Sequence, residues 1–213
     1  MDLPISLGKT VEVGCGPWTQ LRSILSTRTE LTMTSVTLLD PNIDYYKAYS
    51  EVFKGGRFRP TPAGADYPVR LIAAGGEALN GTEHFEAYDT LVMMNVVEHV
   101  MDAVTLFNNI YDALKPGGML VFHEKHMDHE KGRDAPCVRG EVPTLHPIRI
   151  KAAFLCAFAD MFEPIMFNDK PTDEMRRASY RGLYLVGRKL ARSQAAAARL
   201  GRCSKGKASR CAL

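Results

Sequence analysis

The chain has 213 residues, 46% of them hydrophobic, which suffices for one ordinary domain with a buried core. No apolar run approaches the roughly 18 residues of a membrane-spanning helix, and the opening MDLPISLGKT lacks the apolar segment of a signal peptide. Five cysteines without a CxxC pair favour reduced thiols over a disulfide framework or a zinc site. We therefore expect a cytoplasmic protein without a membrane span.

The net charge of +3 is a property of the end of the chain. Eight of the 27 basic residues and none of the 24 acids lie from Arg188 onward, so the rest of the chain is net negative. A negative body gives no electrostatic reason to expect a nucleic-acid partner.

Strand-like and helix-like runs alternate along the chain. The run 89–95 is apolar throughout, which is typical of a strand buried on both faces. In chain order we expect a strand at 9–13, a helix from about residue 19, a strand at 35–40, a helix over 43–53, a loop at 55–68, strands at 69–75 and 89–95, a helix from 102 to 114, a strand at 119–124, a long loop at 125–146, a helix over roughly 148–162 and two last strands at 163–169 and 182–189.

This alternation predicts an α/β fold, a Rossmann-like doubly wound sheet that is mostly parallel, with an antiparallel last strand pair. Residues 1–189 are expected to form the domain, and residues 190–213 a basic, disordered tail. In such sheets a ligand binds at the carboxyl ends of the strands, beside the first strand.

A glycine turn follows the first predicted strand. Gly14 and Gly16 would let backbone N–H groups approach a ligand at the start of a helix. The third glycine of the dinucleotide fingerprint is replaced by Thr19, and no GK[ST] is present, so neither an NAD fingerprint nor a Walker loop is formed. Asp40 ends the second strand, where a carboxylate can accept both ribose hydroxyls, although an Asx turn with Pro41 is the alternative.

Four stretches occur in order, VEVGCGP, LLDP, YDTLVMMNVVEHV and ALKPGG. Together they resemble the class I S-adenosylmethionine-dependent methyltransferases of the small-molecule type, over residues 9–189. The resemblance implies S-adenosylmethionine as cofactor and methyl transfer to an oxygen or nitrogen of a small molecule.

The resemblance also implies roles for individual residues. The backbone of Gly14, Cys15 and Gly16 would contact the methionine part of the cofactor. Glu12 would orient its amino group and Asp40 would hold the ribose. After the third strand, where relatives carry an acid, this chain has AGGEAL. The expected adenine contacts are therefore the Gly76 backbone and Glu77, and Asn95 would face the methionine carboxylate or the substrate.

The acceptor side of the site is less defined by motifs. His99 and His126 are the candidate bases, and His99 packing locally is the alternative. Candidate substrate contacts are Glu98, Glu124, His146 and Arg149. The alternative for Glu98 is a favourable charge at a helix start.

Two other functions remain open. Some relatives that methylate RNA 3′ ends or quinone precursors carry ExxEH and bind a divalent metal, but Asn95 stands at the first position here. After the fifth strand, such a site could be completed by His123, Glu124, His126 and His129, although no metal is expected. The other alternative is a non-catalytic cofactor-binding or interaction protein. Few residues precede the first strand, where relatives have a helix or two that cover the cofactor. We expect either that the chain is a truncated form or that the cover comes from elsewhere, such as a second subunit of a homo-oligomer.

Overall fold

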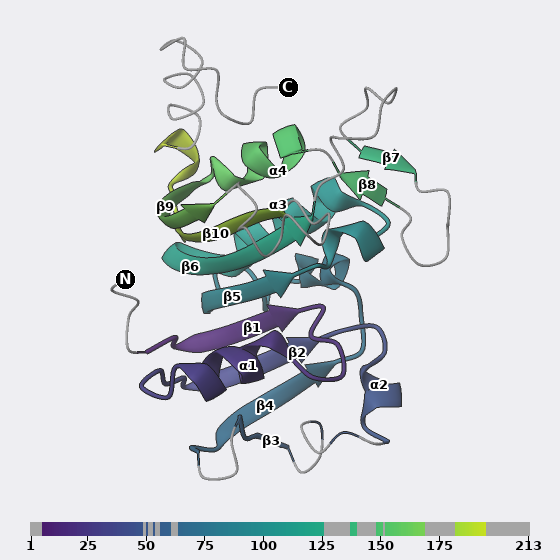
Figure 1. Cartoon of the computed structure of the whole chain (residues 1–213), viewed down its shortest axis with the longest axis vertical. Helices are drawn as coiled ribbons and strands as arrows, with labels where there is room; N and C mark the ends of the chain where they lie inside the picture. Colours follow the sequence, from purple (N-terminus) through teal and green to yellow (C-terminus); the bar gives the residue numbers. More distant parts are fainter. Residues whose placement is uncertain are drawn as a thin grey trace, which may run out of the picture.

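The computed structural model describes residues 6–48, 50, 53, 56–60, 64–125, 137–139, 148–150, 152–168 and 182–194. Its centre is an eight-stranded sheet with the strand order β3-β4-β2-β1-β5-β6-β10-β9 (Figure 1). The strands are β1 (Lys9–Val13), β2 (Ser35–Leu39), β3 (Arg57–Phe58), β4 (Tyr67–Ile72), β5 (Tyr88–Met94), β6 (Leu114–Lys125), β9 (Phe162–Asn168) and β10 (Gly182–Lys189).

The central strands are parallel, as the alternating sequence pattern predicts. β1 pairs in parallel with β2 and β5, β2 with β4, and β5 with β6. β10 is antiparallel to both β6 and β9, so the antiparallel last pair is confirmed, with β9 at the edge. β1 lies between strands that continue the sheet in opposite directions, which creates the switch point where α/β sheets bind ligands.

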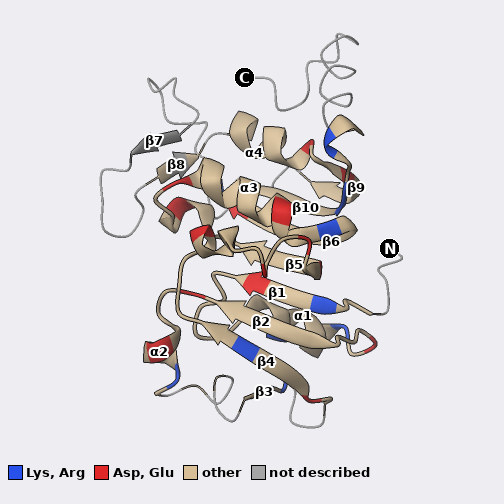
Figure 2. Cartoon of the chain, turned by 180° about the vertical axis from the view of Figure 1, so that it is seen from behind, with Lys and Arg blue, Asp and Glu red and all other residues tan. Residues whose placement is uncertain are grey.

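Helices cover both faces of the sheet (Figures 1 and 2). The helix α1 (Gln20–Thr27) packs with β2 in one apolar cluster, and α3 (Ala103–Ala113) and α4 (Ala152–Ala159) pack in the other. Thr19 and Asp102 cap α1 and α3 by accepting backbone N–H groups with their side chains. Two single-turn 3-10 helices, η2 (Gly76–Asn80) and η3 (Val97–His99), follow β4 and β5.

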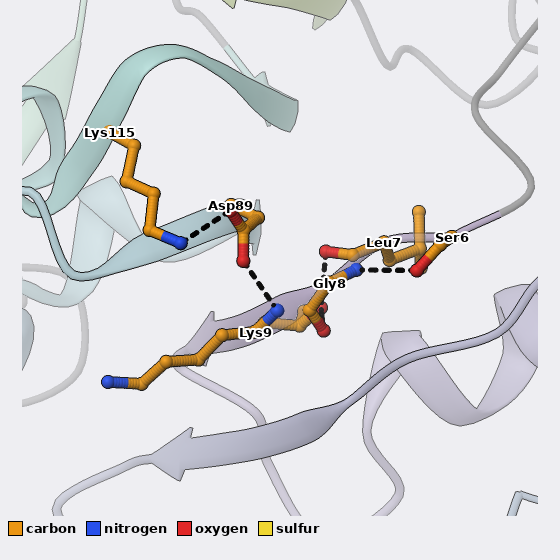
Figure 3. A network of polar contacts seen from close by, with 7 residues as sticks. Ser6, Leu7, Gly8, Lys9, Asp89 and Lys115 are labelled. Carbon is orange, nitrogen blue, oxygen red and sulfur yellow. Dashed lines mark hydrogen bonds and ion pairs between the residues drawn. The ribbon is translucent and has the colours of Figure 1, made fainter.

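Asp89 links the amino ends of β1, β5 and β6, at the other end of β1 from the glycine turn (Figure 3). The Lys9 N–H donates to Asp89 Oδ2 at 2.8 Å, and Lys115 Nζ contacts Asp89 Oδ1 at 2.6 Å. Gly8, at a φ of 61°, passes so close that a Cβ there would lie 2.6 Å from the same carboxylate. This contact fixes the start of β1 and therefore the position of the turn that follows it.

Three predicted elements differ in the structure. The expected helix over 43–53 is shorter, because α2 (Ile43–Tyr46) ends after one turn. The expected helix start at residue 148 is wrong: β8 (Ile148–Ile150) pairs antiparallel with β7 (Cys137–Arg139), and α4 spans only residues 152–159. The apolar spacing of 148–162 fits a helix. Residues 148–150 nevertheless form a strand, because they pair with residues 137–139 of the expected loop. β3 likewise lies within the expected loop at 55–68.

The cysteines also differ from expectation. Cys156 is disulfide-bonded, so the expectation of reduced thiols is wrong at this position, whereas Cys15 is free and buried. An odd number of widely spaced cysteines cannot reveal a pair that only the tertiary fold brings together. None of the helices within the described residues is long and apolar enough to cross a membrane. The expected disordered tail lies, beyond residue 194, outside the described residues.

Candidate functional site

A cavity of about 650 Å³ lies at the carboxyl ends of β1, β2, β4 and β5. Its size is that of a small-molecule or cofactor site. The residues that line it lie far apart in the sequence, but each group of them follows the end of a strand. The sequence-predicted residues that line it are Gly14, Gly16, Asp40, Gly76, Glu77, Asn95 and His99.

The glycine turn is tied to the end of β2. The N–H groups of Gly14 and Cys15 donate to the Leu39 carbonyl at 2.7 and 3.3 Å. Gly14 and Gly16 have φ angles of 66° and 58°, which favour glycine. A Cβ on Gly14 would lie 2.4 Å from Val96 Cγ2, so only glycine fits between this turn and the chain after β5.

Asp40 is a buried carboxylate that fixes two backbone segments beside the cavity. Its Oδ2 accepts the Gly16 N–H at 3.0 Å, and its Oδ1 accepts the Asn42 N–H at 2.9 Å. The second contact is the Asx turn that the sequence offered as an alternative. Asp40 therefore both holds the turn in place and supplies an acceptor at the cavity wall.

Two predicted residues of the turn lie beneath the cavity and are not part of its lining. Glu12 is 1% exposed, and its carboxyl oxygens accept the N–H groups of Gln20 and Leu21 at 2.6 and 3.3 Å. Burial raises the pKa of Glu12 to about 8. The Cys15 side chain packs in the apolar cluster under α1, and burial raises the pKa of its thiol. Both side chains therefore make contacts within the protein and do not face the cavity.

The segment after β4 closes another side of the cavity. Gly76 is buried, and a Cβ there would lie 2.2 Å from Leu106 Cδ1 on α3. Glu77 Oε1 accepts the Met101 N–H at 3.1 Å, which joins η2 to the segment after η3. The acid that the sequence offers in place of the usual one therefore lies at the cavity wall.

Asn95 and His99 reach the cavity from the segment that follows β5. Asn95 has a φ of 55°, and its N–H donates to the His123 carbonyl at 2.9 Å. His99 Nε2 lies 3.8 Å from Glu98 Oε1. The Glu98 side chain is only 13% exposed and is not part of the cavity lining, so it is placed beside His99 and away from the cavity.

Glu124 is fully buried, and the structure does not bring it to the cavity. Its Oε2 accepts the N–H groups of Val96 and Val97 at 2.9 and 2.6 Å, at the start of η3. Burial raises the pKa of Glu124 to about 7. Glu124 is predicted to contact the substrate, but in the structure its carboxyl group accepts hydrogen bonds from two backbone N–H groups. Without it these donors would be buried without a partner.

The structure does not place the three remaining candidate residues relative to the cavity. His126 and His146 lie outside the described residues, and Arg149 is described only as part of β8. Within the described ranges no group of three metal-binding side chains occurs, although the histidines at 126 and 129 fall outside them.

Sequence reasoning did not assign His123 to the acceptor side. It precedes Glu124 on β6, is buried, and stacks on Tyr184 of β10 with 4.0 Å between ring centroids. The only signal for His123 in the sequence is its position near the end of a predicted strand.

Comparisons with known proteins agree with this arrangement. A family model described as a methyltransferase domain matches residues 3–155. No curated protein matches the chain.

Solved structures share its fold at low sequence identity. An S-adenosylmethionine-dependent methyltransferase from Methanosarcina mazei is 17% identical, with a TM-score of 0.57, over 85% of this chain and 92% of that chain. Another from Mesorhizobium loti is also 17% identical, with a TM-score of 0.55, over 88% and 94%. The 1,6-didemethyltoxoflavin-N1-methyltransferase of Burkholderia thailandensis, solved with 1,6-didemethyltoxoflavin and S-adenosylhomocysteine, is 15% identical, with a TM-score of 0.51, over 86% and 71%.

Proposed function

Because this chain belongs to the methyltransferase domain family and has the fold of class I S-adenosylmethionine-dependent methyltransferases, we propose that it methylates an oxygen or nitrogen of a small-molecule acceptor. S-adenosylmethionine is the methyl donor of this class. Its sulfonium supplies an already activated methyl group, so the protein mainly has to position the acceptor atom in line with it.

The observation that carries the proposal is the cavity at the strand ends. Gly14 lets the turn pass against Val96 at the cavity wall, and Asp40 offers a carboxylate in the same lining. Asn95 Oδ1 is buried and has no hydrogen-bond partner among the described residues, as expected of an atom that a ligand would satisfy. These features fit a nucleoside with a polar amino-acid tail.

We assign the parts of the cofactor accordingly. The Gly14–Gly16 turn would hold the methionine part, Asp40 the ribose hydroxyls, and Gly76 with Glu77 the adenine. Asn95 would face the methionine carboxylate or the acceptor. Glu12 would act on the cofactor only indirectly, by holding the first turn of α1 against β1.

Isothermal titration calorimetry with S-adenosylmethionine tests the cofactor site. The substitution Asp40→Asn keeps the size of the side chain but removes its charge, and it should weaken binding at least about tenfold, or about 1.4 kcal/mol. Asp44→Asn is the matched control, because the Asp44 side chain is 76% exposed on α2. Unchanged affinity in Asp40→Asn would contradict the ribose assignment.

The same titration separates the proposed function from its alternatives. Failure of the unsubstituted protein to bind S-adenosylmethionine would overturn the proposed function. Binding without release of adenosylhomocysteine, across a panel of small hydroxyl and amine compounds, would leave a cofactor-binding protein. Release with RNA alone would overturn the small-molecule assignment.

A further inference from the structure

Two buried side-chain atoms have no hydrogen-bond partner within the described part of the chain, and they lie on neighbouring strand ends. They are Asn95 Oδ1 and His123 Nε2. β5 and β6 run in parallel with Met94 opposite His123, and the Asn95 N–H donates to the His123 carbonyl at 2.9 Å. A buried polar atom without a partner is costly, and such atoms are rare in folded proteins. Two at the carboxyl ends of neighbouring strands point to a ligand that donates hydrogen bonds to them.

The His123 ring is held firmly by its neighbours. The residue is 8% exposed and its ring stacks on Tyr184. Gly182, on the same strand as Tyr184, leaves room for the tip of the ring, since a Cβ there would lie 2.6 Å from Nε2. Burial, with a smaller effect from Lys125, lowers the pKa of His123 to about 4. The imidazole is therefore neutral near pH 7.

Another histidine in the same fold shows how a structural imidazole is satisfied. His84 is 3% exposed and stacks against Tyr88, but its Nδ1 is hydrogen-bonded to the Tyr88 hydroxyl at 2.9 Å. Its Nε2 lies 3.5 Å from Glu83 Oε1. Burial and stacking alone therefore do not explain the free nitrogen of His123.

Building on the proposed function, we propose that Asn95 Oδ1 and His123 Nε2 together bind the methyl acceptor. Both atoms would accept hydrogen bonds, so the acceptor is a neutral molecule with two hydrogens to donate, and the O–H or N–H of its reacting atom donates to His123 Nε2. Asn95 lines the cavity and His123 lies on the strand that pairs with β5, so the acceptor would bind between the carboxyl ends of β5 and β6.

The proposed pair also accounts for the proton. The acceptor heteroatom forms a bond to the methyl carbon, the carbon–sulfur bond breaks, and its electron pair stays on sulfur. A methylated hydroxyl oxygen or aromatic amine nitrogen is then positively charged and acidic, and its proton passes to His123 Nε2 and afterwards to water. Since the proton becomes acidic only as the new bond forms, a weakly basic neutral imidazole suffices.

Nitrogen-15 NMR of the imidazoles in the adenosylhomocysteine complex tests this pair. Phenol and anisole are the probes, because they share a ring but only phenol carries an O–H group. We expect phenol to shift the Nε2 resonance of His123 and anisole to leave it in place. The substitution His123→Phe assigns the resonance among the six histidines and keeps a ring to stack on Tyr184.

Phenol affinity of the variants gives the second measurement. His123→Phe should weaken phenol binding at least tenfold while adenosylhomocysteine still binds. His84→Phe is the matched control and should leave phenol affinity unchanged. Equal responses to phenol and anisole, no response to either, or unchanged phenol affinity in His123→Phe would overturn this inference alone. Loss of adenosylhomocysteine binding by the unsubstituted protein would overturn the proposed function with it.

Discussion

Individual residues at the strand ends decide whether the cavity can form. Gly14 passes against Val96, and Asp40 holds the N–H of Gly16. Their residue types could be read from the sequence, because a turn with positive φ needs glycine and a ribose needs an acceptor. The inward positions of Glu12 and Glu124 could not, because a carboxyl group beside a helix start can face either the ligand or the backbone.

Replacing Gly14 tests the close approach at residue scale. Gly14→Ala and Gly16→Ala both place a side chain at positive φ, which costs about 1–2 kcal/mol. Only the Cβ at Gly14 meets a neighbour, and the stiff Val96 side chain should add about 1–3 kcal/mol. Urea unfolding should therefore show Gly14→Ala as the less stable variant.

A second substitution isolates the cause. Val96→Ala removes the methyl group that the new Cβ would meet, so it should recover part of the stability lost in Gly14→Ala. If the two glycine variants are equally stable, the contact with Val96 is not what requires glycine at position 14.

At the scale of elements, buried carboxyl groups join strands to the turns that follow. Glu12 on β1 accepts N–H groups at the start of α1, and Glu124 on β6 does the same for η3. Each satisfies donors that a helix start leaves without an intrahelical partner. The strand–helix order was predictable from local pattern, whereas the β7–β8 pair was not, because its strands are separated by residues 140–147 of the expected loop.

Glu12 should make stability depend on pH. Its pKa is about 8 in the folded protein against about 4.3 when unfolded, so the folded state keeps a proton that the unfolded state releases. This stabilising contribution is complete below pH 4.3 and is lost as the pH rises to about 8. Glu12→Gln removes the titration, so its free energy of unfolding should fall less over this range, by at least about 1 kcal/mol.

Urea unfolding at pH 5 and pH 8.5 measures this difference. The exposed Glu163→Gln on β9 serves as the control and should follow the unsubstituted protein. Parallel pH profiles for Glu12→Gln and the unsubstituted protein would contradict the raised pKa.

At the scale of the whole molecule, aromatic packing joins the helices α3 and α4 to the sheet. Phe158 on α4 stacks on Phe107 of α3, with 4.0 Å between ring centroids, and meets Phe122 and Phe162 edge-on. These rings connect two helices with β6 and β9. They therefore hold the outer part of the sheet to the part that carries the cavity.

Phe158→Ala should lower the free energy of unfolding by about 3–5 kcal/mol, because a 2% exposed ring is removed from a packed cluster. Phe85→Ala, at a residue that is 61% exposed, should change it by no more than about 0.5 kcal/mol. Urea denaturation compares the two. Similar small losses would show that the cluster does not hold the layers together.

The sequence alone determined the α/β class, the parallel core, the antiparallel last pair and the glycine turn after β1, because these follow from short-range periodicity and from residue types at strand ends. Only the tertiary structure decided which side chains face the cavity. Glu12, Cys15 and Glu124 point inward and His123 is left with a free nitrogen, because burial and pairing depend on neighbours that come together through folding.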